Sequence, residues 1–288
     1  MKIVRLLAVV LFLCNCSVFA QLDSFLGTIA EKDIEHYVEP FATTLGTALN
    51  SGMYHTANIP DDLGFSLSLQ TIVVLIPESQ RTFTPGTPDA ALGYDLSQKS
   101  STIFGPGAAT IYTGDAGFIS YPGGFDLKHA TFPLPQISVN KWHTELVLRF
   151  VPGIKISGKK FTFYCVGLRY SFGQYFDLPF DVSAHGIYNR IELTDVVASN
   201  STAFGLAVSK SFGILTPYAG LQFESTNVTF DYKVTEQDKR ITKTIDVNGQ
   251  NMARFTVGAA VKLSFVVLNT DFNLGSQNNA TAGFSIQF

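Results

Sequence analysis

The last ten residues of the chain alternate between apolar and polar side chains. Ala280, Ala282, Phe284, Ile286 and Phe288 share one parity, while the positions between them hold Asn, Thr, Gly, Ser and Gln. Side chains on a β-strand point alternately to its two faces, so the segment predicts a strand with one apolar and one polar face. A chain built from such strands must cover each apolar face with more protein or with lipid.

The same alternation recurs along most of the chain after Phe65. We predict strands with one apolar face at residues 65–75, 142–150, 164–172, 178–188, 203–209, 221–226, 254–263 and 266–273. The terminal strand and a less regular strand over residues 109–119 bring the count to about ten, an even number as single-chain bacterial barrels require. The sequence therefore predicts an all-β fold, an antiparallel transmembrane β-barrel of about ten strands.

The predicted connections alternate between tight and long. Residues 264–265, 212–216 and 173–176 give short turns, whereas residues 77–106, 190–200 and 233–251 give long polar loops. Short periplasmic turns and long external loops are typical of outer-membrane barrels. Residues 152–158 form a shorter outer loop than this pattern expects. Residues 121–135 hold several Pro and Gly residues and predict a structured loop.

The first 20 residues have the layout of a secretory signal peptide. Lys2 and Arg5 precede an apolar run, and Val18, Phe19 and Ala20 form a small-residue cleavage site. Neither Cys14 nor Cys16 follows a small residue, which disfavours a lipoprotein signal. No later stretch has ~18 uninterrupted apolar residues, so we expect no transmembrane helix. Export without such a helix leaves a secreted soluble protein or a barrel.

A helical segment separates the signal from the strands. Apolar residues at spacings near four predict two short helices, over residues 24–38 and 40–50, with Pro40 in the first turn of the second. Gly52 follows the second helix, as expected after a helix end. We expect residues 21–57 to plug the barrel or to cap its periplasmic mouth, between the signal (1–20) and the barrel (58–288).

Composition excludes several classes of protein. Hydrophobic residues make up 46% of the chain, and 20 Lys and Arg face 23 Asp and Glu, two of the basic residues lying in the signal. This acidic balance argues against nucleic-acid binding. Only Cys165 lies beyond the signal, so we expect no disulfide and no cysteine metal site.

A soluble β-sandwich would also alternate, with its apolar faces packed between two sheets. Two features favour the barrel instead. The polar faces mix charges with small residues such as Gly167, Gly205 and Gly258, as in a crowded lumen. Tyr and Phe also gather near strand ends, as in the aromatic girdles of membrane barrels.

Charged residues on the polar faces are the candidate functional residues. We expect them to line the lumen, as a channel lining or as a ladder of ion pairs that fills it: Lys141, His143, Glu145, Arg149, Arg169, Asp181, His185, Glu224, Arg254, Lys262 and Asp271. His143, His185 and Asp181 also allow a catalytic or metal site near the rim. No nucleophile elbow, metal-binding helix pair or phosphate loop supports one, so we expect no enzyme, cofactor or metal.

Three resemblances add to these inferences. Phe284, Ile286 and Phe288 resemble the terminal signal by which the barrel-assembly machinery recognises bacterial outer-membrane barrels. The segments at residues 50–57, 132–138 and 204–220 resemble an uncharacterised family of exported Gram-negative proteins. A helical segment before a barrel is more distantly similar to the long-chain fatty-acid channels, which have more strands and a longer chain.

These features predict an outer-membrane protein in contact with lipid. The leading hypothesis is passive transport or binding of a small molecule, with a small hydrophobic ligand as a candidate. The alternative is a non-conducting structural or adhesion barrel that acts through its outer loops, and the third is a hydrolase with a site at the rim.

Overall fold

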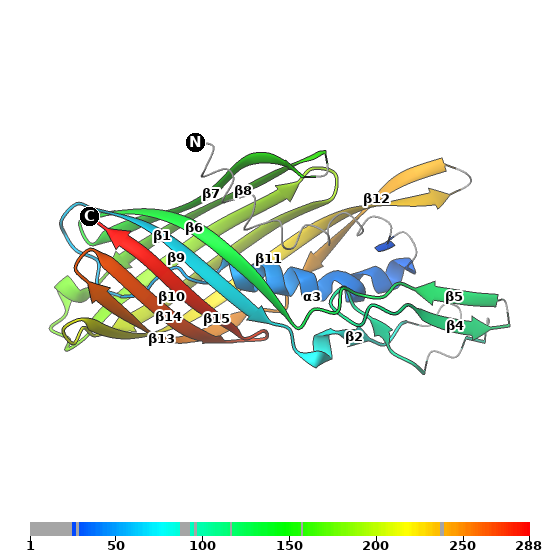
Figure 1. The fold of residues 1–288 in the computed structure, drawn as a ribbon, viewed down its shortest axis with the longest axis horizontal. Coiled ribbons are helices and arrows are strands. Elements are labelled where there is room, and N and C mark those ends of the chain that lie inside the picture. The colour runs from blue at the N-terminus through cyan, green and yellow to red at the C-terminus, as the bar shows by residue number, and fades with distance from the viewer. Residues whose placement is uncertain are drawn as a thin grey trace.

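The structure, a computed structural model, describes residues 25–26, 29–86, 93–94, 97–115, 117–156, 158–236 and 239–288. Its main body is a closed barrel of 10 antiparallel strands (Figure 1). The strands are β1 (Gly64–Leu75), β6 (His129–Lys141), β7 (Thr144–Ile156), β8 (Lys159–Ser171), β9 (Asp181–Leu193), β10 (Val197–Ser209), β11 (Leu215–Glu236), β13 (Ala253–Leu263), β14 (Val266–Leu274) and β15 (Asn279–Gln287). The first strand pairs with the last. The predicted fold class is therefore confirmed, and the two-sheet sandwich is excluded. The proposed signal, residues 1–20, lies outside the described residues.

The barrel has two different ends. At the turn end, short connections join β6 to β7, β10 to β11 and β13 to β14, and both the start of β1 and the end of β15 lie there (Figure 1). At the loop end, residues 76–128 connect β1 to β6, and β12 (Lys239–Asn248) pairs with the far half of β11 beyond the barrel. The predicted long loop at residues 233–251 is thus largely a β-hairpin. The one at residues 190–200 is wrong, because only three residues, 194–196, separate β9 from β10.

The long connection at the loop end has its own structure. It holds η1 (Glu78–Gln80), β2 (Thr82–Phe83), β3 (Ser100–Ser101), β4 (Thr110–Gly114) and β5 (Gly117–Tyr121). The strand predicted over residues 109–119 is this β4–β5 hairpin, which pairs only with itself outside the barrel. The barrel still has ten strands because β6, which the alternation did not predict, takes the place of that strand.

Strand β6 coincides with a predicted loop because it contains Pro133 and Pro135. Phe65 of β1 exchanges backbone hydrogen bonds with Phe288, so the odd-numbered residues of β1 point their backbone groups away from β6 and the even-numbered ones bond to β6. Pro133 and Pro135 stand opposite odd-numbered residues of β1, so their backbone nitrogens face β7 rather than β1. Pairing between β6 and β7 covers only residues 137–141 and 144–148. The prolines therefore sit on an unpaired edge, where a missing N–H costs no ladder hydrogen bond.

One helix, α3 (Glu31–Leu49), runs from just beyond the loop end into the barrel (Figure 1). The prediction of two helices separated at Pro40 is wrong, because Pro40 lies inside the continuous helix. Burial of Tyr37, Val38 and Phe41 around it offsets the hydrogen bond that proline cannot donate. The helix begins near the loop end, and residues 50–63 continue from it to the turn end. We call residues 31–63 the inserted segment.

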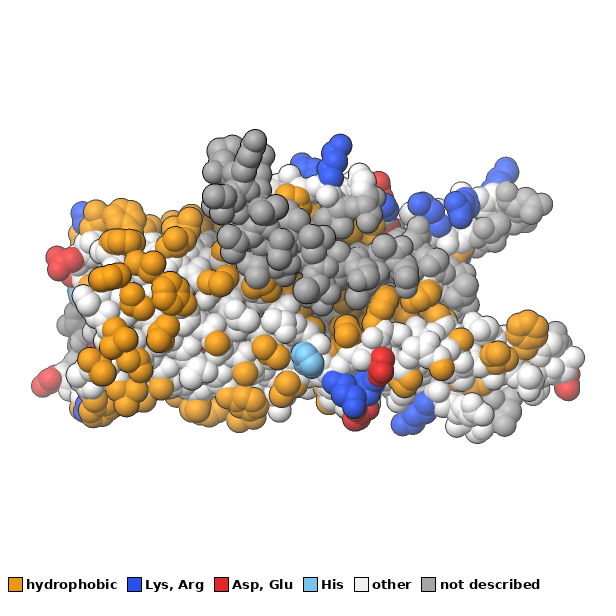
Figure 2. Space-filling view, in the orientation of Figure 1, with side chains coloured by type: hydrophobic (Ala, Val, Ile, Leu, Met, Phe, Trp, Pro, Cys, Tyr) orange, Lys and Arg blue, Asp and Glu red, His pale blue; other side chains and the backbone are white. Residues whose placement is uncertain are grey.

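The outer surface of the barrel carries a belt of exposed apolar side chains over its turn-end half (Figure 2). On β10 the outward positions Phe204, Leu206 and Val208 are exposed, and nearer the loop end the same face holds Asn200 and Thr202. The alternation of the sequence thus separates an apolar exterior from an interior that contacts the inserted segment. Among the described residues, no helix combines the length and apolar character needed to cross a bilayer.

Candidate functional site

The barrel interior has an apolar half and a polar half. Toward the loop end, the inward side chains of β8, β9 and β11 are aliphatic or aromatic, among them Phe163, Ile191 and Phe230. Helix α3 packs against them, and the ring of Phe41 lies 5.9 Å from that of Phe230. Toward the turn end, the inward side chains are charged or polar and bind residues 47–56 of the inserted segment.

Arg149 of β7 binds the end of the helix. Its two terminal nitrogens donate to the carbonyls of Leu49 and Ser51, each at 2.8 Å, and its Nε donates to Gln136 at 3.0 Å. The last carbonyls of a helix have no partner within it. A buried arginine of the wall supplies one of those missing donors, at Leu49, and also binds the carbonyl of Ser51 just past the helix, so barrel and helix end are held together.

Two further wall arginines bind the same segment. Arg254 of β13 pairs with Glu224 and donates to the carbonyl of Thr47 at 3.2 Å. Arg169 of β8 pairs with Glu145, donates to the carbonyl of Thr56, and lies 5.7 Å from the ring centre of Tyr54. Each arginine therefore joins an acid or amide of the wall to a backbone carbonyl of the inserted segment.

Asn50 of the inserted segment binds several strands of the wall at once. Its amide nitrogen donates to Ser201 at 2.8 Å and to Glu224 at 3.2 Å. Its side-chain oxygen accepts from Asn189 at 2.9 Å, and its backbone carbonyl accepts from Gln222 at 3.1 Å. Strands β9, β10 and β11 thus all bind this one side chain or its peptide.

Close approach of the two parts requires glycine at two positions. A Cβ on Gly46 of the helix would lie 2.1 Å from the hydroxyl of Thr226, and one on Gly220 of β11 would lie 2.0 Å from the hydroxyl of Tyr54. Both distances are far inside van der Waals contact. The inserted segment and the wall are therefore fitted to each other.

The connection over residues 76–128 closes the loop end around the start of α3. The hydroxyl of Tyr121 donates to the buried carboxylate of Asp33 at 2.6 Å, and the backbone N–H of Gly86 donates to the same carboxylate at 2.8 Å. The hydroxyl of Tyr37 donates to the carbonyl of Gly123 at 3.0 Å. The outer connection is thus docked on the helix.

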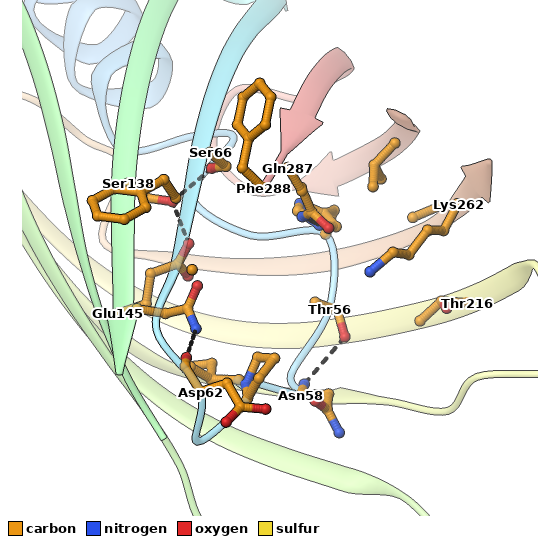
Figure 3. Close-up of a pocket in the computed structure, with 18 of the residues that line it drawn as sticks. Thr56, Asn58, Asp62, Ser66, Ser138, Glu145, Thr216, Lys262, Gln287 and Phe288 are labelled. Atoms are coloured by element: carbon orange, nitrogen blue, oxygen red, sulfur yellow. Dashed lines mark hydrogen bonds between the residues drawn. The ribbon is translucent and has the colours of Figure 1, made fainter. Parts of the chain in front are cut away.

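A pocket of about 370 Å³ opens at the turn end (Figure 3). Glu145, Arg169 and Lys262 line it together with Thr56, Ser138 and Gln287. A much smaller void of about 10 Å³ lies deeper, between residues 50–54 and the wall. Among the described residues, no group of three His, Cys, Asp or Glu side chains is arranged to hold a metal ion.

The structure divides the eleven candidate residues into three groups. Six are buried inside the barrel: Arg149, Arg169, His185, Glu224, Arg254 and Asp271. Glu145 and Lys262 line the turn-end pocket. The other three lie at the turn-end rim rather than in the lumen, a correction to their prediction: Lys141 is exposed, His143 is in the β6–β7 turn with a φ of 57°, and Asp181 binds Asn58 at 3.0 Å.

His143 and His185 do not come together in one site. His143 Nδ1 lies 3.1 Å from the carbonyl of Ile59 at the rim. His185 Nε2 lies 2.9 Å from Gln222 Oε1 in the interior. Asp271 accepts a hydrogen bond from Tyr218 at 2.9 Å. Each group is hydrogen-bonded within the protein.

The model of the family of unknown function DUF6588 matches residues 1–288. The chain belongs to this family. No curated protein matches the chain.

Several solved outer-membrane proteins are similar to the chain at low identity. A loop-deletion mutant of OmpT from Vibrio cholerae is 9% identical with a TM-score of 0.29, covering 79% of this chain and 98% of its own. The channel DcaP of Acinetobacter baumannii is 8% identical with a TM-score of 0.21, covering 82% and 99%. A mutant of the Rh. blastica porin is 8% identical with a TM-score of 0.18, covering 79% and 99%.

The eleven candidates include neither the residues of the inserted segment that bind the wall, such as Asn50 and Ser51, nor the neutral wall residues that bind Asn50. Asn50 and Ser51 belong to the stretch at residues 50–57 that carries the resemblance to this family, and that stretch proves to lie inside the barrel. Asn189, Ser201 and Gln222 lie on the inward face with Glu224. Strand parity alone could have added them, had neutral side chains been counted with the charged ones.

Proposed function

We propose that this member of the DUF6588 family spans the outer membrane and passes a small solute when the turn-end part of its inserted segment moves. The apolar belt on the turn-end half of the barrel supports the membrane location, because exposed apolar surface of this extent needs lipid to cover it. Short connections favour the turn end as the periplasmic side, with the docked 76–128 connection outside. The proposal includes no catalytic step.

The way the inserted segment is held is the observation that carries the proposal. In the turn-end half, residues 47–56 contact the wall mainly through hydrogen bonds from arginine and amide side chains. Water or a solute can replace each of these hydrogen bonds, so the net stabilisation of each is limited: ~1 kcal/mol for a neutral pair and about 1.5–3 kcal/mol for a bond from an arginine. A wall that remains solvated after the segment moves is what a channel lumen requires.

A reversible cross-link tests whether this movement is needed. The hydroxyls of Thr56 and Ser209 lie 3.2 Å apart, so cysteines at these positions are placed to form a disulfide. In planar bilayers we expect Thr56→Cys/Ser209→Cys to conduct when reduced and to stop when oxidised. The single variant Thr56→Cys should conduct in both states.

Two results would count against the proposal. Equal conductance of the oxidised and reduced double variant would show that the segment need not move. No conductance and no uptake of small neutral solutes into vesicles by the reduced chain, even after Arg149→Gln loosens the helix end, would exclude passage through the lumen.

The loop end favours a second function, a non-conducting barrel that contacts a partner outside the cell. The β4–β5 hairpin projects beyond the barrel, and its Phe118 and Ile111 side chains are 71% and 60% exposed. This function predicts that Phe118→Ser with Ile111→Ser abolishes surface attachment while the cross-link above has no effect.

A further inference from the structure

One strand of the barrel, β15, presents a polar inward face along its whole length, and its two neighbours extend this polar surface over part of theirs. On β15 the inward positions are Asn279, Thr281, Gly283, Ser285 and Gln287, and the neighbouring strands add Ser66, Ser68 and Gln70 from β1 and Asn269, Asp271 and Asn273 from β14. The opposite wall differs in its loop-end half, since β8 turns Phe161, Phe163 and Cys165 inward there. The inward face of β15 is therefore polar from the loop end to the turn end, whereas that of β8 is polar only near the turn end, at Arg169 and Ser171.

The helix turns a matching polar face to the wall formed by β14, β15 and β1. Thr44 and Thr47 lie three residues apart on one side of the helix, and Ser51 follows them just past the helix end. Thr44 donates to Gln277 at 2.9 Å, and Ser51 donates to Asn279 at 3.3 Å. Gln277 in turn bonds Gln80 at the loop end. We call the contact between these three residues and the polar wall the polar seam; it runs from Gln80 down to the turn-end pocket.

Several buried polar atoms along the polar seam lack a partner within the described part of the chain. They are Thr47 Oγ1, Gln70 Oε1, Asn269 Oδ1, Asn279 Nδ2 and Ser285 Oγ. Buried polar groups are almost always hydrogen-bonded to protein or to ordered water. The void of about 10 Å³ beside Ser51 and Asp271 is about the space one water needs. Because these unpartnered polar atoms occur at several positions along the polar seam, they indicate a line of water molecules between the helix and the wall.

We propose that the polar seam is the route by which a small, uncharged, hydroxyl-rich solute of sugar size crosses the barrel. The inference rests on the passage function proposed above and adds its path and its substrate class. In the structure the polar seam is only as wide as single waters, so it carries solute when the inserted segment shifts away from β15. The apolar contacts on the other side of α3 remain in place during this shift.

The chemistry of the polar seam selects a neutral solute. Its wall offers amides and hydroxyls, and these exchange hydrogen bonds with sugar hydroxyls without leaving a charge unpaired. The acid on this wall, Asp271, already accepts from Tyr218 at 2.9 Å and from Asn273 at 2.6 Å. Arg254 is paired with Glu224. An ion would lose its hydration shell and meet no free counter-charge among these described side chains.

The pocket at the turn end fits the same class of solute. Its volume of about 370 Å³ lies within the ~300–1,000 Å³ common for small-molecule sites. Ser66 and Gln287 belong both to this pocket and to the inward faces of β1 and β15. The polar seam therefore opens directly into a space large enough for a monosaccharide.

Cysteine accessibility tests hydration of the polar seam without requiring transport. Ser285 is 1% exposed, and so is Cys165 on the apolar side of the lumen. We expect the thiol introduced by Ser285→Cys, in the full chain folded into lipid vesicles, to react with methyl methanethiosulfonate while Cys165 of the same molecule does not. Peptide mass spectrometry locates the label. An introduced thiol as unreactive as Cys165 would show a dry contact and overturn the inference.

Liposome swelling tests the route and the solute class. Vesicles with the wild-type chain should swell in isosmotic arabinose or glucose, and Ser285→Leu should reduce the rate to that of protein-free vesicles. Ala282→Leu adds comparable bulk to the outward face of the same strand and should swell at the wild-type rate. A heat-dependent shift in gel mobility verifies that each variant forms a barrel.

The remaining outcomes separate this inference from the proposed function. If wild type and Ser285→Leu pass sugars equally, the polar seam is not the route, although passage itself stands. If wild type conducts ions but excludes sugars, the solute class is wrong. If the wild type passes no solute, and if reducing the disulfide of Thr56→Cys/Ser209→Cys does not open that variant either, the proposed function fails. The proposed route then fails with it.

Discussion

Arg254 and Glu224 form an ion pair whose side chains are 2% and 0% exposed. Removing one partner of a buried pair leaves an uncompensated charge, which costs about 3–5 kcal/mol. We therefore expect Arg254→Met to lower the free energy of unfolding by that amount in urea titrations of the refolded barrel. The double variant Arg254→Met/Glu224→Met should recover most of the loss. Arg190 and Glu192 form an exposed pair at 3.3 Å, so Arg190→Met should change stability by only ~0–1 kcal/mol. Equal losses of stability in Arg254→Met and Arg190→Met would contradict the burial of the Arg254–Glu224 pair inside the barrel.

The same arginines show what a sequence can reveal at the residue scale. Strand parity alone identifies Arg149, Arg169 and Arg254 as inward-facing. It also identifies two of their acids, Glu145 and Glu224, because they share that parity. Beyond the side chains of Gln136 and Ser51, the remaining acceptors are backbone carbonyls of residues 47–56. Every residue has a carbonyl, so no sequence pattern marks the ones that an arginine will bind.

At the scale of elements, the fit of α3 against β11 depends on Gly46. Alanine is the better helix former by about 0.5–1 kcal/mol, so propensity alone predicts that Gly46→Ala stabilises the chain. The added Cβ would lie 2.1 Å from Thr226 Oγ1, and overpacking of this kind costs about 1–3 kcal/mol. We expect a net loss of stability in the same urea titrations. Glu35→Ala, on an exposed position of α3, is the control and should have little effect. A more stable Gly46→Ala would show that the helix is not seated as described.

Docking of the 76–128 connection on α3 should depend on pH. Burial and the adjacent Asp33 carboxylate raise the pKa of Tyr121 above its ordinary value. The folded chain thus holds the hydroxyl proton more tightly than the unfolded chain. This contribution to docking is complete below about pH 10 and is lost as the pH rises through the higher folded value. Limited proteolysis should cut the connection faster above about pH 10 in the wild type. The Tyr121→Phe variant should show no such pH step, and an identical step would assign it to another group.

The elements that the sequence misplaced share a physical cause. Pro133 and Pro135 are compatible with a strand only because the β7 side of β6 is unpaired there, and pairing is a tertiary fact. The β4–β5 hairpin has the same alternation as a barrel strand, since period two reports two faces and not what covers them. The sequence predicts a loop at residues 190–200 because β9 and β10 extend beyond the apolar belt at the loop end. Their outward residues there, such as Arg190 and Asn200, are polar.

At the scale of the whole molecule, the apolar belt predicts a depth-dependent response to charge. Leu206 lies outward in the belt of β10, and Asn200 lies on the same face nearer the loop end. An arginine at the bilayer midplane costs about 2–4 kcal/mol and one near the interface ~0–1 kcal/mol. We expect Leu206→Arg to lower the stability of the barrel in lipid vesicles by the larger amount and Asn200→Arg by the smaller. Equal costs would place the membrane elsewhere on the barrel or nowhere.

The direction in which α3 runs has a consequence for biogenesis. The helix begins at the loop end, yet it joins β1 at the turn end, and β1 meets its second neighbour only when β15 arrives. A finished barrel could accept this helix only by threading the chain ahead of it through a lumen that residues 31–63 themselves fill. The strands must therefore assemble around the helix before β1 and β15 pair and close the barrel. The helix is then a template for ring closure, and variants that unseat it should delay the appearance of folded barrel in the membrane before they alter the finished protein.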